Sequence, residues 1–200
     1  KDGPQAELHG ISVDVTELKR AEQGQRLLAD AAEVLVAAVD DREAMAKLAS
    51  LVVPELADWC VIDAFVESSV EPRAIAYGGS GQDAVAEALE RRLDFGPDDP
   101  RGVARVFRTG KSELRAQIGE PEELAEALGL AERDVVAEIR ASSYMIVPLR
   151  ARERRLGVMT LIAAASGRRF SAAELALAEE LGRRAALVIE NARLYREAHA

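Results

Sequence analysis

Cysteine, histidine and aromatic residues are scarce in this chain of 200 residues, which has one cysteine, two histidines and 4% aromatic residues. A single cysteine, Cys60, cannot form a disulfide within the chain, so we expect a reducing compartment and a cytoplasmic protein. The two histidines, His9 and His199, stand at opposite ends of the sequence and belong to no HExxH motif. No metal site and no catalytic site is therefore predicted.

Basic charge and long apolar runs are also lacking. The net charge is −9, whereas a protein dedicated to nucleic acid needs a basic face. No apolar run approaches the roughly 20 residues that a membrane-spanning helix requires. The sequence thus predicts neither a nucleic-acid partner nor a membrane partner. Its hydrophobic content of 48% is enough for one packed domain with a helical extension.

Helical periodicity is strong at both ends of the chain. From Thr16 to about Asp40, small and apolar residues recur at alternating three- and four-residue steps, as in the seam of a coiled coil. The last helix is predicted to begin with a capping box of Ser171 and Glu174 and to carry a second seam. The two seams are Leu18, Ala21, Gln25, Leu28, Ala32, Leu35 and Val39, and then Ala178, Leu181, Ala185, Val188, Ala192 and Tyr195.

Two interpretations of these seams are open. Each helix could pack only on its own domain, or the helices of two copies could form a parallel bundle. Alanine-rich seams allow helices to approach closely, and on that ground we predict a homodimer. The residues expected at its interface are Leu18, Leu28, Leu35, Leu181, Val188 and Tyr195.

The middle of the chain contains two predicted hairpins. Residues 59–66 form a strand by their β-branched and aromatic content, and residues 73–77 are its expected partner after a turn at 67–72. Residues 143–150 and 156–163 form the clearer hairpin, with a charged turn between them.

Between the hairpins we expect helices at residues 83–93 and 103–109, then a short strand and one or two helices between Ser112 and Arg140. The predicted fold class is therefore α+β: a central antiparallel sheet flanked by helices, with long helices at the N- and C-terminal ends that form the dimer bundle.

The opening residues, His9 to Gln23, predict a strand followed directly by a capped helix. Asp14 and Thr16 can accept hydrogen bonds from the free N–H groups of a helix start, and Glu17 suits the positive end of its dipole. This stretch resembles the C-terminal edge of a PAS domain, which would occupy residues 1–16, followed by a signalling helix at 17–40. The resemblance implies a covalently linked PAS domain, and we expect the chain to be a piece of a longer signalling protein.

Four further strings are similar to a bacterial GAF domain family found in multidomain regulators. The resemblance covers about residues 25–196, and it implies a GAF domain at 41–196 with an exit helix at 171–198. It also implies a downstream output domain, either a serine/threonine phosphatase of the PP2C type or a histidine kinase. The strings are Leu56 to Asp63, Arg101 to Gly110, Ser143 to Leu149 and Asn191 to Tyr195.

The family resemblance also implies a place for a small-molecule ligand, between the sheet and the helix-rich middle of the chain. Alternation along residues 59–66 puts Asp63 and Phe65 on one face with Trp59 and Val61. The cavity expected there is lined by Asp63, Phe65, Tyr77, Phe107 and Tyr144. The alternative is core packing for the aromatic residues and an arginine partner for Asp63. No ligand and no cofactor is identified.

Two other features have both a functional and a structural interpretation. Cys60 could attach a bilin, but an apolar strand without a neighbouring histidine favours a buried core thiol. Arg101, Arg105 and Arg108 share one helix face, which suits an anion site or, more simply, a solvated surface.

We conclude from the sequence that the chain is a non-catalytic sensory module that dimerises and signals through its terminal helices to an output domain. The alternatives are a ligand-free dimerisation scaffold and the sensor module of a histidine kinase. An enzymatic GAF domain ranks last, because nucleophiles and metal ligands are lacking.

Overall fold

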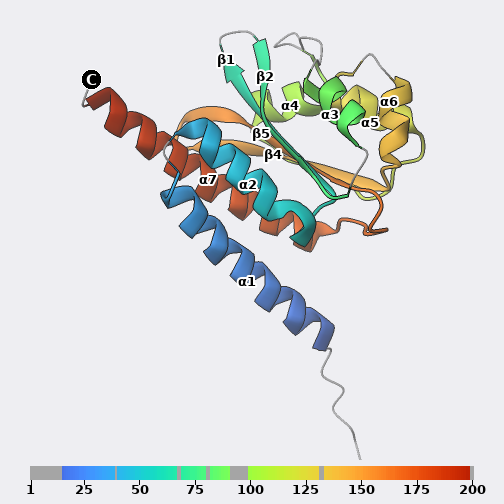
Figure 1. The fold of residues 1–200 in the computed structure, drawn as a ribbon, viewed down its shortest axis with the longest axis horizontal. Helices are drawn as coiled ribbons and strands as arrows, with labels where there is room; N and C mark the ends of the chain where they lie inside the picture. The colour runs from blue at the N-terminus through green and yellow to red at the C-terminus, as the bar shows by residue number, and fades with distance from the viewer. Residues whose placement is uncertain are drawn as a thin grey trace, which may run out of the picture.

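A five-stranded antiparallel sheet forms the centre of the computed structural model (Figure 1). The structure describes residues 15–38, 40–66, 69–79, 82–90, 99–130 and 133–198. The strand order is β2-β1-β5-β4-β3. The strands are β1 (Trp59–Val66), β2 (Ser69–Tyr77), β3 (Glu113–Arg115), β4 (Ser143–Ala151) and β5 (Arg154–Ala163). The predicted α+β fold with an antiparallel sheet is confirmed.

Helices cover both faces of this sheet (Figure 1). Three long helices lie on one side of it. α2 (Asp41–Glu55) and α7 (Ala172–Ala198) pack on the sheet, and α1 (Val15–Val36) packs on these two helices. Four short helices cover the other: α3 (Asp83–Glu90), α4 (Gly102–Thr109), α5 (Pro121–Leu128) and α6 (Arg133–Ile139). No helix among the described residues is long and apolar enough to cross a bilayer.

Strand alternation divides the hydrophobic core into two clusters, one on each face. Cys60 and Ile62 of β1 lie in the cluster with α1, α2 and α7, whereas Trp59 and Val61 lie in the cluster with α3 to α6. This is the period of two that a sheet buried on both faces imposes. The face under the short helices is where the sequence places the cavity.

Both predicted hairpins are present, but their turns are shorter than expected. β2 already begins at Ser69, and β4 and β5 remain paired up to Ala151 and Arg154. The prediction of a turn through residue 72 was wrong, because β2 includes Pro72, which pairs with Asp63 of β1. β2 is an edge strand, where a proline without an N–H group is tolerated, and the register shifts beside it.

Helix starts agree well with the sequence. Asp40 caps α2, accepting a hydrogen bond from the Glu43 amide at 2.8 Å. At the start of α7 the amide of Ser171 donates to Glu174 at 2.9 Å, as predicted for the capping box. Residues 1–14, which include most of the suggested PAS edge, lie outside the described residues.

The helical seams are largely buried within a single copy of the chain. The exposed fractions of Leu28, Leu35 and Leu181 are 7%, 1% and 0%. Val188 is half-buried, and the side chains of Leu18 and Tyr195 lie outside the described part. Three of the six residues expected between two copies are thus in the core that α1, α2 and α7 form with one face of the sheet. The period of 3.5 residues identified the buried stripe without indicating what it packs against.

Candidate functional site

The residues expected to line one cavity have separate surroundings. The ring of Tyr77 stacks on Trp59 with centroids 4.7 Å apart, and its hydroxyl donates to Asp83 at 2.5 Å. Phe107 carries the guanidinium of Arg155 over its ring, 5.6 Å from the centroid. Asp63 is fully buried, and the side chain of Phe65 lies outside the described residues. Of the four whose side chains the structure describes, only Tyr144 lines the cavity described next.

That cavity lies where the N-terminal end of α4 meets α5, β3 and β4, and its volume is about 340 Å³. Three arginines and three glutamates face it, together with the ring of Tyr144. The charged lining residues are Arg101, Arg105, Arg115, Glu113, Glu123 and Glu126. The described lining contains no serine, cysteine or histidine.

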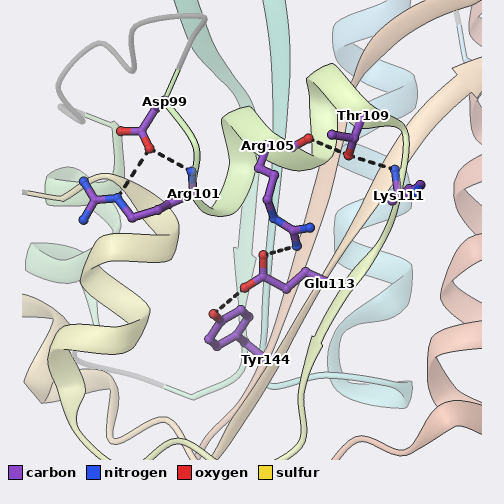
Figure 2. A network of polar contacts seen from close by, with 7 residues as sticks. All are labelled: Asp99, Arg101, Arg105, Thr109, Lys111, Glu113 and Tyr144. Carbon is purple, nitrogen blue, oxygen red and sulfur yellow. Dashed lines mark hydrogen bonds and ion pairs between the residues drawn. The ribbon is translucent and has the colours of Figure 1, made fainter.

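A chain of three residues crosses one wall of the cavity (Figure 2). Arg105 of α4 donates to one carboxylate oxygen of Glu113 at 2.5 Å, and the Tyr144 hydroxyl donates to the other at 2.8 Å. Tyr144 is 2% exposed. Burial raises the pKa of its phenol, and the bond to Glu113 raises that pKa further. The hydroxyl therefore stays protonated near neutral pH and acts as a donor.

The other charged lining residues also form ion pairs. Arg115 contacts Glu123 at 3.1 Å, and Arg101 contacts Glu126 at 3.4 Å. Arg101 also donates to Asp99 (Figure 2). The positive and negative charges of the lining are therefore balanced. An anion entering the cavity would have to compete with a carboxylate that is already in place.

Close packing between α4 and α5 fixes the shape of the cavity. Gly102 has a φ of 48°, and a Cβ there would lie 1.9 Å from the carbonyl oxygen of Ala127. Only glycine allows both this left-handed backbone and this approach. Both residues line the cavity.

The sequence identified Tyr144 and Arg105 as candidates but missed Glu113, which joins them. The short strand was placed only approximately, between residues 112 and 140. Its pairing, Glu113 opposite Ile146 and Arg115 opposite Tyr144, puts the Glu113 side chain on the same face as Tyr144. That register is a long-range fact which local periodicity does not reveal.

The comparisons with known proteins agree with this architecture. A family model described as GAF domain matches residues 22–190. The chain belongs to the GAF domain family. The match includes α2 to α6, all five strands and most of α1 and α7.

Solved structures share the fold of this GAF domain at low sequence identity. The GAF domain of an Acinetobacter phosphoenolpyruvate-protein phosphotransferase has a TM-score of 0.63 at 15% identity, over 88% of this chain and 95% of that one. The GAF domain of a putative sensor histidine kinase from Pseudomonas syringae pv. tomato has a TM-score of 0.59 at 13% identity, over 93% and 99%.

A third similar structure belongs to an enzyme, the free methionine-R-sulfoxide reductase of Neisseria meningitidis in complex with its substrate. Its TM-score is 0.62 at 15% identity, over 96% of this chain and 99% of that chain. A likeness at such low identity shows a shared fold alone. A search of curated proteins gave no match.

Thiol chemistry is disfavoured in this GAF domain by the position of its one cysteine. Cys60 is fully buried in β1, and burial raises the pKa of its thiol well above the usual range. Its side chain lies in the cluster with α2 and α7, on the face of the sheet opposite the cavity. A neutral, enclosed thiol is a poor nucleophile.

Proposed function

We propose that this GAF domain is a non-catalytic sensor module and that the cavity beside Tyr144 is its ligand site. The observation that supports this most is the cavity itself. Its volume is about 340 Å³, and one side of it is formed by Arg105, Glu113 and the buried Tyr144, which are hydrogen-bonded to one another. Its volume falls within the ~300–1,000 Å³ of ordinary small-molecule sites.

The balanced charges favour a polar ligand that carries both a donor and an acceptor group. An acceptor group would bind Arg105 or Tyr144, and a donor group would bind Glu113. A ligand of one charge alone would leave one member of the Arg105–Glu113 pair without its partner, which is costly in a partly buried site.

Native mass spectrometry of the protein as purified tests this proposal. We expect extra mass that disappears on denaturation, and its loss from the Tyr144→Phe variant. Tyr77→Phe is the matched control, because it removes a tyrosine hydroxyl that bonds elsewhere, to Asp83. Extra mass that both variants retain would place the ligand at another site.

A ligand-free scaffold is the second candidate, favoured by the ion pairs that already satisfy the lining. Two results together would support the scaffold and contradict the sensor. The first is bare polypeptide mass in that experiment. The second is a panel of small polar metabolites, none of which raises the melting temperature of wild type more than that of Tyr144→Phe.

We also propose that two copies associate through α1 and α7, using side chains that a single copy leaves exposed. Val36 is 77% exposed and Leu194 is 39% exposed. Val36→Glu should shift the sedimentation coefficient from dimer to monomer, whereas Ala116→Glu, at an exposed loop position before α5, should leave it unchanged. A dimer that survives Val36→Glu would contradict this interface.

Finally, we propose that a PAS domain precedes this unit, that α7 leads to an output domain, and that the parent protein acts in the cytoplasm. A PP2C-type phosphatase is the first candidate for the output and a histidine kinase the second. Both rest on the family resemblance of the sequence strings. Release of phosphate from a phosphoserine peptide, or transfer of the γ-phosphate of ATP to a histidine, would distinguish the two in the full-length protein.

A further inference from the structure

The edge strand β3 touches both layers of the domain. It has only three residues and pairs with β4 alone. Side chains alternate across such a strand, so Glu113 points to the cavity face and Leu114 to the opposite face. Leu114 packs against the hydrophobic cluster that includes Ala178 and Leu181 of α7.

On the cavity face, β3 is attached through the ion pair of Arg115 with Glu123 and through Glu113. Both oxygens of its carboxylate are engaged, one by Arg105 and one by Tyr144. The loop between α4 and β3 is short and held by its own bonds: the Thr109 hydroxyl donates to the Arg105 carbonyl and accepts from the Lys111 amide (Figure 2). A shift of α4 is therefore carried into β3.

On the opposite face, the residue before β3 is attached to α7. The Ser112 hydroxyl donates to the Glu179 carboxylate at 2.6 Å. Adjacent residues thus hold the cavity wall and the C-terminal helix, and they are joined by one peptide bond. A movement that releases Glu113 cannot leave Ser112 in place unless that peptide unit rotates.

We propose that β3 couples the state of the cavity to α7. A ligand that takes Arg105 or Tyr144 from Glu113 removes one of the two attachments of β3 on its cavity face. The loosened strand alters the Ser112–Glu179 contact and the packing of Leu114 on the hydrophobic cluster that includes α7. Three paired residues at a sheet edge give β3 a small local free energy of opening, so modest ligand binding energy suffices to move it. By linkage, a change imposed on α7 alters ligand affinity by the same factor.

The idea that this coupling carries a signal rests on the proposed sensor function. The coupling itself does not, since it is a property of the ligand-free chain and is measured there. Hydrogen exchange followed by mass spectrometry reports local opening of α7 amides without a ligand.

The first variant is Glu113→Gln, which keeps the shape of the side chain and removes its charge. We expect exchange in peptides covering residues 175–186 to accelerate by about 2- to 10-fold, with no change in α2. Glu126→Gln is the matched control, because Glu126 lines the same cavity and contacts Arg101 but is not bonded to β3. Equal effects of the two variants on α7, or none from Glu113→Gln, would overturn the proposal.

The second measurement runs in the opposite direction and uses Ser112→Ala, a variant of a half-buried side chain that should fold. Exchange around Tyr144 in β4 should accelerate, and the double variant with Glu113→Gln should show less than the product of the two single effects. Effects that multiply would mean that the two contacts are independent and that β3 does not couple them. The two proposals can therefore be contradicted separately. Bare polypeptide mass in the native spectrum contradicts the sensor function, and unchanged hydrogen exchange in α7 contradicts the coupling through β3.

Discussion

Gly157 lies so close to Asp63 that a Cβ at position 157 would stand 2.0 Å from the Asp63 carbonyl oxygen. The two residues belong to β5 and β1, which are neighbours at the centre of the sheet. No side chain fits there without separating the two strands, so the position depends on glycine.

Gly157→Ala should lower the free energy of unfolding by about 2–4 kcal/mol, since the central strands must move apart to admit a methyl group. Urea denaturation measures the change. Gly78→Ala serves as the control, because its Cβ would meet only ordinary contacts, the nearest at 3.7 Å from Val53. Similar losses for both variants would show that the close approach to Asp63 is not the cause.

Gly24→Ala should have the opposite effect. Gly24 lies inside α1, where alanine is favoured over glycine by about 1 kcal/mol. The new Cβ would meet the Leu177 side chain at 3.5 Å, an ordinary van der Waals distance. We expect a gain of about 0.5–1 kcal/mol in the free energy of unfolding. A loss of stability would mean that α1 and α7 pack more tightly than the structure describes.

Cys60 should not react with a thiol reagent in the native protein at pH 8. The side chain is fully buried, and burial raises the pKa of its thiol. Colour release from a disulfide reagent should appear only in denaturant, at the rate of unfolding. Rapid reaction of the folded protein with one equivalent of reagent would contradict the placement of Cys60.

The contribution of Glu180 in α7 to the stability of the domain should depend on pH. Bonds from Arg183 and Arg184 lower the pKa of this carboxyl to about 2. A carboxyl with a lowered pKa stabilises the fold above its unfolded pKa of about 4.3, and that stabilisation disappears as the pH falls toward 2.

Because the pair is partly exposed, solvent screening limits its contribution to about 1 kcal/mol at most. Glu180→Gln should therefore be less stable than wild type at pH 7, and the difference should vanish near pH 2. The same difference should shrink in 1 M salt. A difference that is constant from pH 7 to 2 would assign the effect to packing instead of charge.

Local sequence patterns predicted most of the fold, because most helices and hairpins are determined by residues close together in the sequence. The hairpin of β4 and β5 follows from apolar strands around a charged turn, and the start of α7 follows from the spacing of Ser171 and Glu174. The family resemblance was confirmed, whereas the PAS edge and the output domain remain predictions.

The candidate site was harder to predict, because it depends on pairing between distant segments. Tyr144 and Glu113 meet only through the register of β3 on β4, and Tyr77 stacks on Trp59 instead of facing the cavity. The helical seams show the same limit. Their period identifies a buried stripe, but Leu28 and Leu35 are buried in the cluster that α1 forms with α2 and α7 of its own chain.

The burial of Leu28 and Leu35 affects where this domain can be divided. Removing α1 would leave an apolar stripe of α2 and α7 open to water, so a fragment that starts at Asp41 should aggregate, while one that starts before α1 should remain soluble. α1, the helix that would transmit a signal from an upstream domain, also contributes buried side chains to the core. A signal that rotates α1 must therefore change the packing of these side chains. The melting temperature of the domain should then differ between the states with and without the signal.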